Sequence, residues 1–179
     1  DLLPFGGIEE ADGKVHTEGL GLTSINLQGF KEVYESDLPS IDLEGKHIFR
    51  FCSLPGYVIL KMISWDDRPD ERQDDIKDIA SLLLSFYGMY EEIIWEKHND
   101  LYGDHVLPHD QLAAIVMGRE MREIALRNPR LFDRLSSILD RETRNPDTSK
   151  MAELMLLATE ETIAEKIDLL NHIMSGFHE

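Results

Sequence analysis

The chain has 179 residues, of which 42% are hydrophobic and 30% are charged, a composition typical of one folded domain and unlike a disordered segment. Its 35 acidic and 18 basic residues give a formal net charge of −17, which disfavours the basic surface that nonspecific DNA binding requires. No apolar run approaches the roughly 20 residues that span a bilayer, so no membrane partner is expected.

Residues 1–5 are apolar apart from Asp1 and predict a buried strand, which Pro4 and the turn pair Gly6 and Gly7 bring to an end. A natural N-terminus usually has a polar lead-in and an initiator Met. Here the first residue already belongs to an apolar segment, so we expect a fold that begins upstream of Asp1.

Short strands are predicted between residues 8 and 54. Three segments alternate apolar and polar residues or are rich in β-formers, namely 23–27, 41–43 and 47–52. Glu44 and Gly45 supply a turn between the second segment and the third. Apolar residues at helical spacing favour a short helix within residues 27–34.

Helical signals begin at Ser53, which is predicted to be the N-cap of a helix with Pro55 in its first turn and its end near Trp65. A second helix is predicted from residue 69 to residue 87. Its apolar face would consist of Ile76, Ile79, Ala80, Leu83 and Leu84. Gly, Asn and Pro residues separate four further predicted helices, at residues 90–99, 109–127, 129–142 and 148–176.

These elements predict an α+β fold, in which a small mixed sheet is followed by a C-terminal helical bundle. We expect residues 1–88 to form the α+β core and residues 89–179 to form a helical region packed on it. The methionines of the later helices are most simply core residues. The alternative is a groove for a partner, for which an antitoxin or a second copy of the chain would be suitable.

The single cysteine, Cys52, cannot form an internal disulfide, and its apolar neighbours favour a small buried side chain. A reducing compartment fits this composition. The acidic N-terminus also lacks the basic region of a signal peptide, so the expected location is the cytoplasm.

The stretch from residue 53 to residue 79 carries the clearest candidates for chemistry. Lys61 stands in an otherwise apolar helix, where its ammonium must either reach water or meet an anion such as a carboxylate or a phosphate. Arg68 and Arg72 stand four residues apart, and Asp75 and Asp78 three apart, so each pair can share a helical face. The five side chains could converge at the junction of the two helices.

Two interpretations of this pattern remain open. In the structural one, Lys61 reaches solvent along its aliphatic stem, the acidic residues favour the N-terminal end of the second helix, and the arginines form surface salt bridges. In the functional one, Lys61 and an arginine hold nucleotide phosphates while an aspartate orients them.

A resemblance bears on this choice. Ser-Leu-Pro-Gly at residues 53–56 is followed by Lys61, by Trp-x-Asp-Arg at 65–68, and by Arg-x-x-Asp-x-x-Asp-Ile at 72–79. This order is similar to that of predicted nucleotidyltransferases related to the AbiEii toxin family. The strand Asp-Leu-Leu-Pro-Phe-Gly-Gly-Ile-Glu at 1–9 resembles theirs as well, and Val-Met-Gly-Arg-Glu at 116–120 resembles a turn in their helical region. The similarity covers residues 1–125.

The resemblance implies a nucleotidyltransferase-type mixed sheet and a site that binds a nucleoside triphosphate with Mg²⁺ or Mn²⁺. It assigns catalytic roles to Asp1, Lys61, Asp75 and Asp78, metal binding to Asp1, and nucleotide binding to Lys61 with two arginines. Those arginines are Arg68 and Arg72.

The activity that the resemblance implies is transfer of a nucleoside monophosphate to an RNA or protein acceptor, by the toxin of a toxin-antitoxin or phage-defence pair. The Asp-x-Asp pair that should precede Asp1 is not in these 179 residues, so enzymatic activity stays open. The alternative is a non-catalytic binding or regulatory module with the same fold, acting through protein contacts with an antitoxin or as a homodimer.

Overall fold

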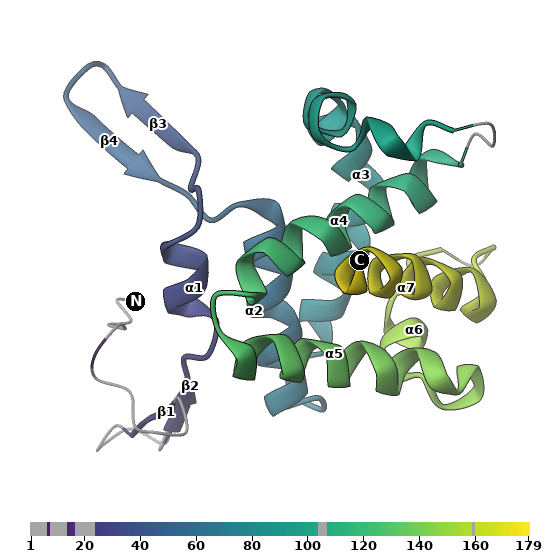
Figure 1. The fold of residues 1–179 in the computed structure, drawn as a ribbon. Helices are drawn as coiled ribbons and strands as arrows, with labels where there is room; N and C mark the ends of the chain where they lie inside the picture. The colour runs from purple at the N-terminus through teal and green to yellow at the C-terminus, as the bar shows by residue number, and fades with distance from the viewer. Residues whose placement is uncertain (1–6, 8–13, 17–23, 104–106, 159) are drawn as a thin grey trace.

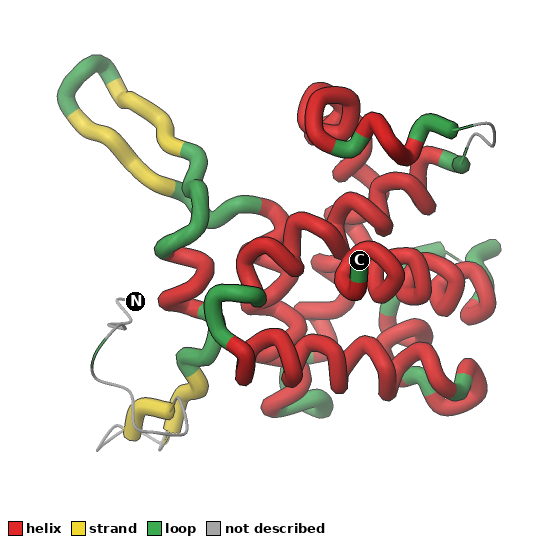
Figure 2. The backbone as a smooth tube through the Cα atoms, in the orientation of Figure 1, coloured by secondary structure: helices red, strands yellow, loops and turns green. Residues whose placement is uncertain are grey.

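Helices make up most of the residues that the structure describes, and four short strands among them form two hairpins (Figure 1, Figure 2). The computed structural model describes residues 7, 14–16, 24–103, 107–158 and 160–179. The predicted α+β class is confirmed in this form. The strand predicted at residues 1–5 lies outside the described residues.

The described strands pair only within their own hairpins. β1 (Lys14–His16) pairs with β2 (Ser24–Asn26), and β3 (Ser40–Leu43) pairs with β4 (His47–Arg50), both antiparallel. In this part of the chain there are thus two separate two-stranded sheets where we expected one mixed sheet. The three predicted strand segments are confirmed, although 47–52 ends at Arg50.

The turn between β3 and β4 lies at the residues that the sequence predicts. Glu44 and Gly45 both have positive φ, 57° and 67°, and the Lys46 amide donates to the Leu43 carbonyl over 3.1 Å. This is the tight I′ type of turn, whose twist matches that of a hairpin. The hairpin extends away from the helices, and all eight strand residues are exposed (Figure 1).

α1 (Phe30–Tyr34) and α2 (Leu54–Asp67) follow the two hairpins. The predicted cap of α2 is confirmed, because the Ser53 hydroxyl accepts a hydrogen bond from the Gly56 amide and Pro55 lies in the first turn. α3 (Gln73–Lys97) is longer than predicted. It passes through Gly88, where we expected a break, and the predicted boundary between residues 88 and 89 falls inside it.

The length of α3 follows from its packing. One glycine inside a helix costs only about 1 kcal/mol relative to Ala. The buried face continues past Gly88 to Ile94, which is fully buried, so tertiary contacts outweigh that cost. The predicted apolar face is confirmed for Ile76 to Leu83 but is wrong for Leu84, which is 67% exposed.

α4 (His109–Ala125), α5 (Pro129–Arg144), α6 (Lys150–Leu154) and α7 (Ile163–His178) complete the helical region, with short 3-10 turns at η1 (Asn99–Leu101) and η2 (Pro146–Thr148). The single helix predicted at 148–176 is wrong. It is divided because Thr162 and Glu165 form a capping box that starts α7, and Glu161 accepts hydrogen bonds from the Leu157 and Ala158 amides.

α4 and α7 approach each other so closely at two glycines that no larger side chain would fit at those positions. A Cβ added to Gly118 would lie 2.0 Å from the Ile173 carbonyl oxygen, and one added to Gly176 would lie 2.0 Å from that of Ile115. The segment 116–120, for which the resemblance suggested a turn, is therefore part of a helix and forms a backbone-to-backbone contact.

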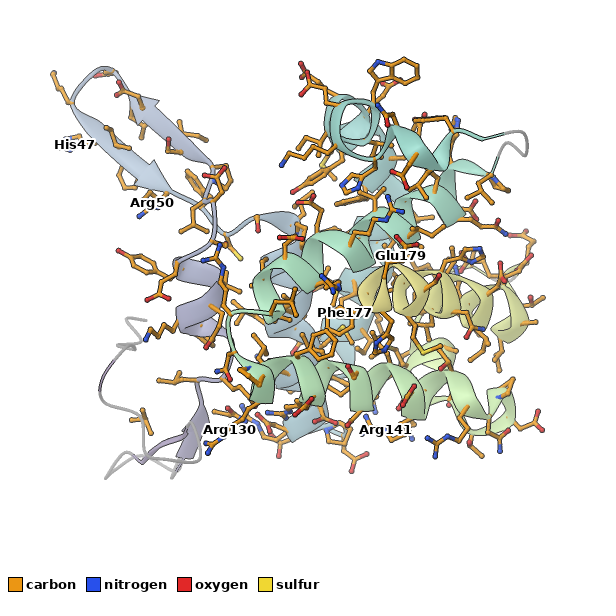
Figure 3. All side chains as sticks on the ribbon, viewed as in Figure 1. His47, Arg50, Arg130, Arg141, Phe177 and Glu179 are labelled. Atoms are coloured by element: carbon orange, nitrogen blue, oxygen red, sulfur yellow. The ribbon has the colours of Figure 1, made fainter. Side chains whose placement is uncertain are left out.

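The helices share one apolar core, to which both predicted regions contribute. Trp65 and Phe86 are among its largest buried side chains, together with Phe177, whose ring stacks on Phe132 at 4.9 Å (Figure 3). No helix in the described ranges is both long and apolar enough to cross a membrane.

Candidate functional site

The junction of α2 and α3 brings together four of the residues singled out in the sequence. Lys61 on α2 points its ammonium between two carboxylates of α3, with Nζ 2.7 Å from Asp75 Oδ1 and 2.7 Å from Asp78 Oδ2. The two aspartates share one helical face because they stand three residues apart. The predicted convergence of these side chains is therefore present.

Burial differs across this cluster. The Asp75 side chain is 6% exposed, that of Lys61 21% and that of Asp78 49%. The Tyr57 hydroxyl donates to Asp78 over 3.4 Å, and the Lys61 ammonium lies 5.2 Å from the centre of the Tyr57 ring. The ammonium is thus held by one buried carboxylate and one carboxylate that faces solvent.

Two opposing effects act on the pKa of Lys61. Partial burial is the largest single effect and lowers it, but the hydrogen bonds to Asp75, Asp78 and Tyr57 and the charge of Asp75 together raise it by more, so the pKa lies above the ordinary value for lysine. The side chain is therefore a permanent cation at physiological pH.

Arg72 joins the cluster from the start of α3, and Arg68 does not. Arg72 Nε donates to Ser64 Oγ over 2.8 Å and lies 3.1 Å from Asp75 Oδ2. The contact between Arg72 and Asp75 is an ion pair and not a hydrogen bond. Among the described residues, the buried Oδ2 of Asp75 has no hydrogen-bond partner. Arg68 forms an ion pair with Glu71 at 3.6 Å instead.

The cluster of Lys61, Arg72, Asp75 and Asp78 contains two positive and two negative charges. Its members compensate one another, as the structural interpretation requires. The ammonium and Asp78 also reach the surface, as the functional interpretation requires. Both interpretations are compatible with this geometry.

The described residues do not by themselves supply a metal site. No group of three or more His, Cys, Asp or Glu side chains in those ranges is arranged to hold an ion. Asp1, to which the resemblance assigns metal binding, lies outside the described residues. The predicted Mg²⁺ or Mn²⁺ therefore has no ligand set that can be derived from this geometry.

A second charged network was not predicted. Arg134 on α5 donates to Asp66 over 2.9 Å and to Asp67 over 2.7 Å, and Arg141 lies 3.0 Å from Asp66. Arg141 also lies over the ring of Trp65, at the outer edge of α5 (Figure 3). The signal in the sequence is the spacing of seven between the two arginines, which places them on one face of a helix.

In this network, Asp66 and Asp67 of the Trp-x-Asp-Arg motif form the contact between α2 and α5. The Arg134 side chain is 19% exposed and also donates to Gln28 over 3.0 Å. Asp66 and Asp67 are therefore occupied by contacts that fix the end of α2.

A cavity of about 620 Å³ lies beside the base of the β3–β4 hairpin, lined by residues of α2, α3 and α4. Inside it, Nε2 of the buried His98 lies 3.0 Å from Oε1 of Glu120. The segment 116–120 thus contributes Glu120 to this cavity, while the neighbouring Arg119 binds Asp100 with two hydrogen bonds of 2.9 and 2.7 Å.

The prediction of a buried Cys52 is wrong, because the residue is exposed. Its thiol is turned toward the chain, with Sγ donating to the Ser53 carbonyl over 3.3 Å. Partial burial of the sulfur raises the pKa of the thiol to about 11. The thiolate is therefore scarce at neutral pH, which makes Cys52 a poor nucleophile.

Comparison of this chain with family models, with curated proteins and with solved structures finds no match in any of the three.

Proposed function

We propose that this protein is nucleotidyltransferase-like, of the kind related to the AbiEii toxin family, and that the α2–α3 cluster binds the phosphates of a nucleoside triphosphate. The supporting observation is the meeting of three residues that the resemblance assigns to the site. Lys61 contacts Asp75 and Asp78 at 2.7 Å across 14 and 17 residues of sequence.

In this proposal the exposure gradient decides which partner a phosphate displaces. Asp75 keeps its contact because it is buried, and it holds the Lys61 ammonium at the surface. A phosphate oxygen would take the place of Asp78, which is half-exposed. Asp78 would then be free to accept a hydrogen bond from an incoming hydroxyl of an RNA or protein acceptor.

Arg72 is the second cation that a phosphate can reach, because its side chain is 46% exposed and its contacts with other described side chains are made through Nε. Arg68, whose side chain is 41% exposed, is the more distant nucleotide-binding candidate. The proposal includes a nucleotidyltransferase-type sheet and a cytoplasmic location.

The resemblance implies Mg²⁺ or Mn²⁺, which would neutralise charge on the triphosphate when bound. Asp1 is the residue of this chain that it assigns as a ligand. Activity as the toxin of a toxin-antitoxin or phage-defence pair belongs to the same proposal.

The test is calorimetric titration of the protein with ATP, GTP, CTP and UTP in the presence of Mg²⁺. We expect binding of at least one triphosphate and a loss of affinity of about tenfold or more in Lys61→Met, since a charged hydrogen bond contributes about 1.5–3 kcal/mol. Lys46→Met, on the exposed hairpin, is the matched control and should bind as the wild type does. Equal affinity in the two variants would contradict the proposal.

A second candidate function is a binding module that acts as a homodimer, and the β3–β4 hairpin favours it. The hairpin exposes Ile48 (73%), Phe49 (49%) and Ile41 (51%) to solvent. A two-stranded hairpin is only marginally stable without further packing. Its charges are balanced, since Asp42 and Glu44 before Gly45 are matched in number by Lys46 and Arg50 after it, so two copies can pair there despite the net charge of −17.

Light scattering after size exclusion tests this second candidate. A dimer that becomes a monomer in Phe49→Asp, and remains a dimer in Leu84→Asp, would support pairing through the hairpin. Leu84 is the matched control because it is 67% exposed on α3, beside residues of α4 and α7. A monomer at all concentrations would exclude the homodimer.

A further inference from the structure

A surface cavity on α3 is lined by three aromatic rings and two carboxylates. It has a volume of about 460 Å³, within the range of about 300–1,000 Å³ that small-molecule sites occupy. Its lining residues are Tyr87, Glu91, Glu92, Trp95 and Tyr102. The cluster of Lys61 and its partners contributes none of them.

The spacing of the sequence creates this surface. Tyr87, Glu91 and Trp95 stand at intervals of four and therefore lie along one face of α3. Tyr102 reaches the same face from the end of η1, with its ring centre 5.4 Å from that of Trp95 and an angle of 57° between the planes. The three rings therefore line one cavity.

The rings are held by a contact outside the cavity and by contacts with one another. Tyr87 stacks on His109 of α4 with ring centres 4.0 Å apart, and its hydroxyl lies 3.5 Å from that of Tyr102. Trp95 is nevertheless 65% exposed and Tyr102 39% exposed. Large aromatic side chains held in place but left in water are a common feature of binding surfaces.

The charges of the cavity select a cation. Both ionisable residues in its lining other than tyrosine are acidic, and no basic residue lines it among those that the structure describes. The hydrogen bond with Tyr87 raises the pKa of Tyr102 to about 12, with smaller contributions from burial and from the charges of Tyr87 and Glu91. A ring face is itself the negative end of the aromatic quadrupole and attracts cations within about 6 Å.

We propose that this cavity binds a trimethylammonium group, through the ring faces of Trp95, Tyr87 and Tyr102 and the carboxylates of Glu91 and Glu92. A methylated ammonium fits these walls because its methyl groups contact apolar rings while its charge meets the carboxylates. A primary ammonium would have to lose strong hydration that the rings cannot replace.

The experiment titrates the full chain with choline and with its uncharged isostere 3,3-dimethylbutan-1-ol, followed by tryptophan fluorescence. Trp65 is buried and Trp95 is exposed, so a change in emission reports on Trp95. We expect choline to bind at least about tenfold more tightly than the isostere, since the charge supplies the cation–π attraction. Equal binding of the two, or no binding of choline, would overturn the proposal.

Variants locate the site. Calorimetry should show at least about tenfold weaker choline binding in Trp95→Leu, and unchanged binding in Tyr102→Phe, which keeps the ring. Phe51→Leu is the control for loss of an exposed aromatic residue elsewhere, since Phe51 is 47% exposed. Because Trp95 is exposed, its replacement should leave the unfolding midpoint unchanged. Unaltered choline affinity in Trp95→Leu would refute the site.

Further titrations identify the molecule that carries the trimethylammonium group. A peptide carrying trimethyl-lysine that binds more tightly than choline identifies a modified protein, and the reverse order identifies a free small molecule. Tighter binding of free arginine than of either would contradict the trimethylammonium class.

Discussion

Lys61 is held by two carboxylates whose surroundings differ, and this difference predicts unequal effects of mutation. Asp75→Asn should lower the free energy of unfolding by about 1–3 kcal/mol, because it leaves a partly buried ammonium with one carboxylate and removes the charge beside Arg72. Asp78→Asn should cost no more than about 1 kcal/mol, because Asp78 is half-exposed. Urea unfolding at constant m-value measures both, and equal losses would refute the asymmetry.

Glu161 gives a prediction for pH. Its hydrogen bonds to Lys166 and to the Leu157 and Ala158 amides lower its pKa from 4.5 to about 2. A lowered folded pKa means that the stabilisation is complete above the unfolded pKa and is lost as the pH falls from about 4.5 to about 2. Glu161→Gln should therefore lower the melting temperature at pH 7 and make little difference near pH 2. A constant difference at all pH values would contradict this role.

At the scale of elements, the contact between α4 and α7 depends on two glycines. Gly118→Ala should destabilise the protein by about 1–3 kcal/mol or more, because the new methyl group meets the Ile173 carbonyl of the facing helix. Gly88→Ala is the matched control, since nothing lies within 4 Å of its added Cβ. It should stabilise α3 by about 0.5–1 kcal/mol. Thermal unfolding distinguishes the two, and a loss of stability in both variants would refute this account.

The sequence predicted those elements whose signals are local. Ser53 with Pro55 defines the start of α2, and Glu44 with Gly45 defines the β3–β4 turn. It did not predict that α3 continues through Gly88, because burial of residues beyond the glycine decides that. The break before Thr162 was missed although the capping box is visible in the sequence, because the apolar period continues across it.

The candidate site was predictable to the extent that it depends on helical periodicity. Asp75 and Asp78 share a face, and Lys61 stands in an apolar stretch where it must reach water or meet an anion, so their meeting was one of the outcomes that the pattern allowed. Arg68 was not separable from Arg72 by spacing alone, because its pairing with Glu71 depends on the bend between the helices. The aromatic cavity was missed because Tyr102 reaches α3 only through the path of η1.

For the whole molecule, the net charge of −17 predicts that the affinity for a triphosphate increases with the salt concentration. The α2–α3 cluster is locally neutral, so a triphosphate approaches a protein whose overall charge repels it. Raising the NaCl concentration from about 20 mM to about 150 mM shortens the Debye length and should strengthen triphosphate binding. A marked weakening over this range, as for a nucleic-acid binder, would contradict this expectation.

The most direct test of the proposed function is hydrogen exchange measured with and without a saturating triphosphate and Mg²⁺. We expect slower exchange of amides in α2 (Leu54–Asp67) and in the first turns of α3 (Gln73–Lys97), and unchanged exchange in the β3–β4 hairpin. The protection should disappear in Lys61→Met. No protection at the α2–α3 junction, or the same protection in Lys61→Met, would contradict the assignment of this site to a nucleotide.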